Sequence, residues 1–311
     1  GIQVAVKRKL GNVEEIRQAF LDENPAAMTI NVNSNSDTVG NSDIYNRFYP
    51  GIQRVNAQLT DADIEIKKSS TNEVELSVTG GIADDMEALK ETLRVSASVG
   101  TLSIQQEKKA GISVSYAASR LFGLKVGKYS ARIVIHIAVP EQFEKIKVKS
   151  ISGDIKANNS NAKILLIHTG SGDVGVEDCQ ADELFASSIS GDVNVIACKA
   201  DKMDIVSVSG DIKVEFDKSA QCRAKSTSGD CKVTIGNQVD AVVSSTSGDV
   251  SVRYIGEIGL EMALSSTSGD VSAVCGGINS KGKKKVQECF GDPDSKLKVS
   301  TISGDIKIRD C

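Results

Sequence analysis

The triplet Ser-Gly-Asp occurs eight times in the second half of this chain, and six copies lie in strict register. Successive glycines are 19 residues apart five times, and the last two spacings are 21 and 35 residues. A fixed period of about 20 residues is typical of a solenoid, in which each coil contacts only its neighbours. The glycine and aspartate positions are Gly153, Asp154, Gly172, Asp173, Gly191, Asp192, Gly210, Asp211, Gly229, Asp230, Gly248, Asp249, Gly269, Asp270, Gly304 and Asp305.

Apolar residues alternate with polar ones on both sides of each triplet. In the first copy Ile146 and Val148 precede Gly153, Ile155 and Ala157 follow it, and the same positions are apolar in the other copies. Alternate side chains of a strand share one face, so each copy predicts two strands with one buried face. The alternation changes phase at the triplet, which indicates a corner: glycine permits positive φ there, and Ser and Asp can bond the local backbone.

A hydroxyl stands three residues before every triplet glycine, as Ser150 and Thr169 show in the first two copies. In a parallel stack these hydroxyls would form a column that bonds along the stack or to the corner amides. We interpret each aspartate in the same way, as an acceptor for corner amides. The alternative is a ladder of calcium ligands, but one carboxylate per coil is sparse for an ion that takes six to eight oxygens.

The predicted fold class is all-β: a parallel β-solenoid, or β-helix-like stack, of coils of about 19 residues, with a short N-terminal helix and an irregular β capping section. Residues 146–311 would form the regular coils, and residues 52–145 the irregular section. Residues 1–51 would hold the helix, around residues 13–22, and a loop.

An insertion at residues 275–296 separates the seventh and eighth copies, and we expect it to be an exposed loop. Its lysines, Lys281, Lys283, Lys284 and Lys285, are candidate contacts for an acidic partner. Coil eight would then end the stack, where Lys307 and Arg309 would discourage pairing between edge strands.

Composition limits the classes of partner. The net charge is -4, which gives no case for a nucleic acid partner, and aromatic residues make up only 4% of the chain, with no Trp to stack on bases or sugars. No apolar run is long enough to span a bilayer. The chain begins with Gly and shows no signal-peptide pattern, so we expect a trimmed start and leave room for a membrane anchor outside this sequence.

The seven cysteines do not favour a disulfide framework, because their number is odd and Cys222 and Cys231 occupy inward columns. Cys179 and Cys198 take the same place in adjacent coils, so a bridge between these two stays open. There is no CxxC pair, and the only histidines are His136 and His168, so zinc is not favoured. The sequence indicates no cofactor.

Catalysis needs a non-repeating cluster of acids or bases in a cleft, whereas nearly all the notable polar residues here recur in every coil. His168 occurs once, beside Thr169, and we read it as an exposed residue near a strand end. We therefore expect no enzyme, although parallel β-helices often carry polysaccharide lyases and hydrolases.

The repeated S-x-S-G-D-[IV]-x-V and the opening Ala62-Asp63-Ile64-Glu65-Ile66 resemble the bacterial putative-adhesin family of β-strand repeat proteins, also called toastrack domains, over about residues 52–311. The function of this family is unknown. The resemblance implies a noncatalytic binding or scaffold protein at the cell envelope or extracellular surface, with a protein or cell-surface ligand as partner. The alternatives are an envelope-stress regulatory interaction module and a polysaccharide-active β-helix enzyme. The resemblance supplies no catalytic residues and fixes no oligomeric state.

Overall fold

The computed structural model describes residues 45–80, 89–90, 92–106, 133–216 and 221–310. Nearly all regular structure in these residues is β-strand. The helix expected around residues 13–22 lies outside the described residues. No helix in the described part of the chain is long and apolar enough to cross a membrane.

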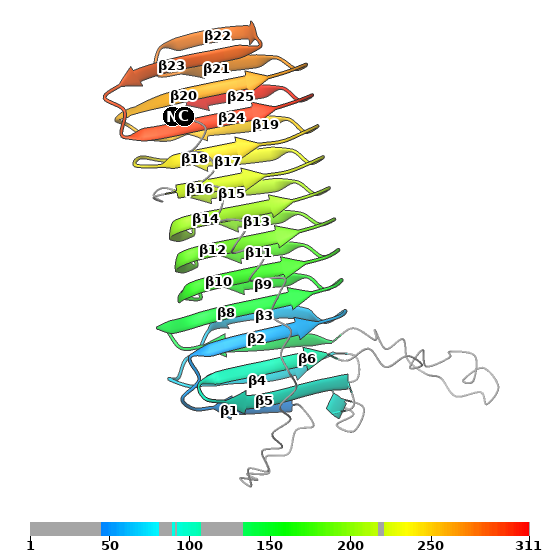
Figure 1. Ribbon diagram of the computed structural model, residues 1–311. Helices are drawn as coiled ribbons and strands as arrows, with labels where there is room; N and C mark the ends of the chain where they lie inside the picture. The colour runs from blue at the N-terminus through cyan, green and yellow to red at the C-terminus, as the bar shows by residue number, and fades with distance from the viewer. Residues whose placement is uncertain (1–44, 81–88, 91, 107–132, 217–220, 311) are drawn as a thin grey trace, which may run out of the picture. The chain divides into compact units, whose positions relative to one another are not determined.

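The strands form two sheets (Figure 1). Sheet 1, in spatial order, contains β1 (Tyr45–Tyr49), β4 (Val74–Thr79), β7 (Val134–Val139), β3 (Asp63–Lys68), β9 (Ile155–Asn158), β11 (Val174–Glu177), β13 (Val193–Ile196), β15 (Ile212–Phe216), β17 (Cys231–Ile235), β19 (Val250–Tyr254), β25 (Ile306–Asp310), β21 (Val271–Cys275) and β22 (Ile278–Lys283). Sheet 2 contains β23 (Lys285–Gly291), β20 (Gly259–Ser266), β24 (Ser295–Thr301), β18 (Asp240–Ser244), β16 (Gln221–Lys225), β14 (Lys199–Ser207), β12 (Gln180–Ser188), β10 (Ala162–Thr169), β8 (Phe143–Ser150), β2 (Arg54–Leu59), β6 (Thr101–Gln106) and β5 (Leu93–Ser98).

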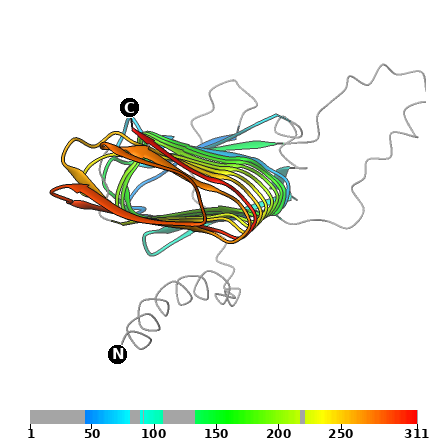
Figure 2. The same ribbon diagram turned by 90° about the horizontal axis from the view of Figure 1, so that it is seen from above.

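Each triplet joins a strand of sheet 2 to the following strand of sheet 1, and equivalent residues of successive coils pair in register. Leu165 lies opposite Leu184 in sheet 2, and Val174 lies opposite Val193 in sheet 1. The apolar columns of both sheets point inward and are buried. Figure 2 looks along the stack, where the successive coils overlie one another and the two sheets face each other. The predicted all-β stack of parallel strands is confirmed.

The coils do not follow chain order at the C-terminal end. Coil eight (β24 and β25) lies between coil six (β18 and β19) and coil seven (β20 and β21). Ile306 is in register with Val250 on one side and with Val271 on the other. In Figure 1 the red strand β25 accordingly lies between β19 and β21. Each coil still contacts only the adjacent coils of the stack, but the expectation that coil eight ends the stack is wrong.

The insertion explains this order. Residues 278–291 are not an exposed loop: β22 pairs antiparallel with β21, and β23 pairs antiparallel with β20. Val286 is buried, and Ile278 and Phe290 pack against the core. These two strands use the backbone groups on the outer edge of coil seven, so coil eight pairs on the inner side. Gly248 and Gly269 are 21 residues apart, two more than the usual 19. These two additional residues lengthen the connection from coil six to coil seven, which has to pass coil eight.

Antiparallel strands also close the N-terminal end. The coil of β2 and β3 precedes coil one (β8 and β9), and β6 and β7 pair parallel with its outer side. Strands β5 and β4 then pair antiparallel with β6 and β7, and β1 pairs with β4. The stack thus includes Tyr45–Tyr49, ahead of its expected start at residue 52.

Candidate functional site

The corner hydroxyls link each coil to the one before it. Ser207 Oγ accepts the backbone N–H of Gly210 at 2.9 Å and donates to the carbonyl oxygen of Gly191, in the preceding coil, at 3.1 Å. Thr169 makes the same two bonds, to the N–H of Gly172 and the carbonyl of Gly153. These side chains are buried, so the bonds satisfy groups that water does not reach.

The aspartates form a second ladder at the rim of the corner. Asp192 N–H donates to Asp173 Oδ1 at 2.8 Å, and Asp173 N–H donates to Asp154 Oδ1 at 3.0 Å. The ladder begins at Asp63, whose Oδ1 accepts Asp154 N–H at 2.8 Å, and runs to Asp270, which donates to Asp305. No group of three or more His, Cys, Asp or Glu side chains in the described ranges is arranged to hold a metal ion. Each carboxylate thus has a structural contact with the next coil.

The triplet glycines are needed for close packing rather than for positive φ. None of them has a positive φ, which corrects the expected reason for glycine at the corner. A Cβ at Gly172 would instead overlap the carbonyl of Gly153, and a Cβ at Gly210 would overlap that of Gly191. Only glycine lets successive corners approach closely enough for the two ladders to form.

The corner ladders are directional, because N–H groups point to the preceding coil and carbonyl and carboxylate oxygens to the following one. The first corner, at residues 60–62, therefore has amides without a preceding triplet. Gln106, at the end of β6, accepts all three with its Oε1, at 2.9 Å from Thr60 N and 3.2 Å from both Asp61 N and Ala62 N.

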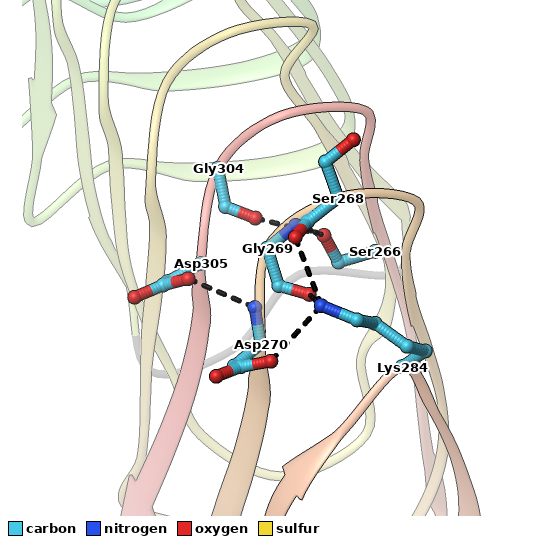
Figure 3. Close-up of polar contacts among 7 residues, drawn as sticks. All are labelled: Ser266, Ser268, Gly269, Asp270, Lys284, Gly304 and Asp305. Carbon is cyan, nitrogen blue, oxygen red and sulfur yellow. Dashed lines mark hydrogen bonds and ion pairs between the residues drawn. The ribbon is translucent and has the colours of Figure 1, made fainter.

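Lys284 closes the other end of the ladders, where oxygens face outward. It lies between β22 and β23, and its Nζ donates to the carbonyls of Ser268 and Gly269, both at 2.8 Å, and to Asp270 Oδ1 at 3.0 Å (Figure 3). Gly269 O and Asp270 Oδ1 are the atoms that bond the next coil elsewhere in the stack. The ammonium thus stands in place of a further coil.

The four candidate lysines do not form one cluster. Lys281 is exposed on β22, and Lys283 Nζ lies 3.2 Å from Ser280 Oγ on the same strand. Lys285 is exposed on β23, in sheet 2. Lys284 serves the corner cap, which leaves Lys281 as the member best placed on the open face of sheet 1.

A His and Ser pair lies on the outer face of sheet 2 and was not predicted from the sequence. His168 Nδ1 lies 2.7 Å from Ser187 Oγ, and His168 is partly buried, not exposed as expected. The two residues are 19 positions apart, which is the repeat length, so the repeat alone predicts that they lie side by side on neighbouring strands. Burial and the Lys149 ammonium lower the pKa of His168.

Asp204 is the other perturbed group on this face. Its Oδ1 is buried and has no hydrogen-bond partner among the described residues, while Oδ2 lies 3.9 Å from Arg223 Nη1. Burial raises the pKa of Asp204, and Arg223 offsets this only in part. Asp204 lies two coils from His168, so the structure does not join them in one site.

Cys179 and Cys198 are buried free thiols in adjacent coils. Each donates to a backbone carbonyl two residues earlier, Cys179 to Glu177 at 3.2 Å and Cys198 to Ile196 at 3.3 Å. Lys199 N–H donates to Cys179 O at 2.9 Å, which fixes the two turns side by side. Cys222 and Cys231 are buried in the inward columns.

Three solved structures match most of this chain at low sequence identity and with TM-scores below 0.5. A putative adhesin from Bacteroides fragilis is 18% identical, with a TM-score of 0.48 over 86% of this chain and 97% of that one. A putative adhesin from Parabacteroides merdae is 13% identical, with a TM-score of 0.39 over 87% and 98%. A putative lipid binding protein from Parabacteroides distasonis is 17% identical, with a TM-score of 0.39 over 86% and 98%.

No curated protein matches the chain. The model of the Toastrack family, DUF4097, matches residues 52–309, which include every triplet and the coil of β2 and β3 that precedes them. The chain therefore belongs to the Toastrack DUF4097 family.

Proposed function

We propose that this protein is a noncatalytic binding or scaffold protein at the bacterial cell envelope or cell surface. The observation that carries the proposal is the use of the repeated polar groups. The hydroxyl, glycine and aspartate of each corner are engaged in bonds from coil to coil, so they build a long regular surface and leave no repeated group poised for chemistry. The envelope location is the one that the resemblance to this family implies.

The His168 and Ser187 pair is the strongest argument for the enzyme alternative, and its surroundings do not support nucleophilic catalysis. Both residues lie within strands paired on two sides, so their backbone N–H groups belong to the sheet and are not grouped to hold an oxyanion. The Lys149 charge disfavours the imidazolium that a general base must form. A surface for binding therefore fits this face better than a catalytic centre.

Fractionation of the native bacterium tests the location, and a turnover assay tests the absence of catalysis. We expect the protein in the envelope or surface fraction, and we expect envelope polysaccharides incubated with the purified protein to release no new reducing ends. A purely cytoplasmic protein would contradict the proposed location. Release of sugar that stops in a Ser187→Ala variant would contradict the noncatalytic role.

A further inference from the structure

The position of coil eight brings together cations that are far apart in the sequence. Lys307 and Arg309 lie on β25, on the outer face of sheet 1, and both are exposed. Arg309 is in register with Arg253 on β19, which lies 56 residues earlier. Coil eight at the end of the stack would have left these cations on an edge strand, away from β22.

One row on this face alternates lysine and serine across five strands. Lys232 on β17 pairs with Ser251 on β19, Ser251 with Lys307 on β25, and Lys307 with Ser272 on β21. On β22, Lys281 lies in the irregular stretch between the pairs Ala273 with Ser280 and Val271 with Lys283, which is the stretch that faces Ser272. Neighbouring strands are about 4.8 Å apart, so successive lysines of the row are about 10 Å apart. Arg253 and Arg309 pair with each other two residues further along β19 and β25, in the adjacent outward row. We call Lys232, Lys281, Lys307, Arg253 and Arg309, from these two adjacent rows, the basic row.

Three charges of the basic row are available to a partner. In the described part of the chain, Lys232, Lys307 and Arg309 form no ion pair, whereas Lys213, one coil earlier, is paired with Glu215 at 2.9 Å. Acidic groups near the row are the triplet aspartates, two residues earlier in each coil, which bond backbone amides, and Glu215 on β15, which is paired with Lys213. The same row carries Lys156 on β9, but Gly175 and Asn194 follow it in the next two coils, so the closely spaced lysines lie toward the C-terminal end of sheet 1.

We propose that the basic row binds a linear acidic polysaccharide that lies along the stack, with a carboxylate at each lysine. This assignment rests on the proposed binding function and names its partner. A carboxylate once per disaccharide suits lysines two strands apart, the serines between them can bond sugar hydroxyls, and arginine can hold a carboxylate with two parallel hydrogen bonds. The described residues of β17, β19, β25, β21 and β22 include no exposed aromatic side chain, because Tyr254 is buried, so a neutral glycan would lack the usual stacking contact there. The carboxylates of the corner aspartates would repel the polymer from the corners, and this repulsion would keep it over the basic row.

Binding to hyaluronan oligosaccharides, which carry one carboxylate per disaccharide, tests the site in the full chain. The first comparison ligand is a chitin oligosaccharide of equal length, which has no carboxylate, and the second is inorganic polyphosphate. The test variant is Lys307→Gln with Arg309→Gln. The matched control is Lys67→Gln with Lys156→Gln, because these exposed lysines occupy the same two rows at the other end of sheet 1. Thermal unfolding of both variants shows that they are folded.

We expect hyaluronan to bind, chitin not to bind, and affinity to fall as salt rises. The test variant should bind about three- to thirtyfold more weakly, as the loss of two exposed ion pairs implies, while the control variant binds like the parent. Equal loss in both variants, no binding to hyaluronan, or stronger binding to polyphosphate would overturn the assignment. If the parent protein still associates with the envelope in those cases, the proposed function stands and only the acidic glycan is wrong.

Discussion

Two glycines of one coil show how the stack uses single residues. Gly172, at the corner, packs against the backbone of Gly153, and Asp173 beside it receives the next ladder bond. Gly175, on the outer face of β11, has only the Lys156 side chain near it, 3.9 Å from the point that a Cβ would occupy. The repeated glycine is therefore a packing requirement, whereas the unrepeated one is not.

Gly172→Ala should destabilise the protein by about 3 kcal/mol, because the methyl group would force two corners apart and stretch the hydroxyl and aspartate bonds. Gly175→Ala is the control and should be neutral or stabilise by up to about 1 kcal/mol, since alanine restricts the unfolded chain more than glycine. Urea unfolding of both variants measures the difference. Equal stabilities would contradict the packing role of Gly172.

Asp204 is a residue whose charge costs stability. Burial raises its pKa in the folded state, so between the ordinary aspartate value and the raised one the folded protein binds more protons than the unfolded chain. Stability from this group is therefore present at low pH and is lost as pH rises through the folded pKa. Asp204→Asn should be more stable than the parent at pH 7.

The advantage of Asp204→Asn should shrink as the pH is lowered toward about 4, the ordinary aspartate value. Urea unfolding at both pH values measures it. Asp201→Asn, an exposed aspartate on the same strand, should show no such gain. A parent more stable than Asp204→Asn at pH 7 would show that the contact with Arg223 outweighs burial.

At the scale of elements, the ends of the stack are closed by antiparallel strands and by single side chains that match the direction of the ladders. Gln106 presents an acceptor to the N-terminal corner, and Lys284 presents a donor to the C-terminal one. Strands β22 and β23 also cover the C-terminal edges of the two sheets, one strand on each sheet, which limits strand addition by other chains. A solenoid needs such end structures because its terminal coils otherwise expose unpaired backbone groups.

Lys284→Met should lower stability by about 1 kcal/mol, because three oxygens lose their donor while remaining partly accessible to water. Backbone amides of β22 and β23 should exchange with deuterium faster, with little change in the central coils. Lys285→Met, an exposed change on the adjacent strand, is the control. If the deuterium exchange of the β22 and β23 amides were the same in Lys284→Met as in the parent, the capping role would be contradicted.

At the scale of the whole stack, coil eight separates two coils whose surfaces already match. Ile306 faces Val250 and Val271 in one register, and Leu297 faces Ala241 and Met262 in sheet 2. Coil seven could therefore pair with coil six directly if coil eight were absent. The position of coil seven in the full chain therefore depends on coil eight, which follows it in the sequence.

Deletion of residues 292–311 should let coil seven dock on coil six in the same register. Ser251→Cys and Ser272→Cys report this, because both face Lys307 in the full chain and are two strands, about 10 Å, apart. That separation exceeds the roughly 7 Å that a disulfide allows between Cα atoms, so oxidation should join the pair only in the shortened chain. In the full chain Ser251→Cys with Lys307→Cys is the positive control. Peptide mapping that finds no disulfide between the two introduced cysteines in the folded shortened chain would contradict the prediction.

The pattern of residues within one 19-residue period is enough to predict the structure of one coil. The alternation around Gly153 predicts two strands and a buried face, and the recurrence of Ser150 and Thr169 predicts a hydroxyl column, because these patterns depend on residues close together in the chain. The phase change at the triplet located the corner, although close packing and not positive φ is the reason for its glycine. The contact between His168 and Ser187 could also have been predicted, because the two residues are separated by one 19-residue period.

The order of the last coils and the closure of both ends depend on contacts between residues far apart in the chain. The coils share one register and one alternation, so β21 matches β19 as well as it matches β25, and no local pattern chooses between these pairings. The choice is made by β22 and β23, which cover the outer edge of coil seven in the two sheets and leave coil eight the inner edge. That choice places Lys307 and Arg309 beside Arg253, and so creates a charged face that the linear sequence does not contain.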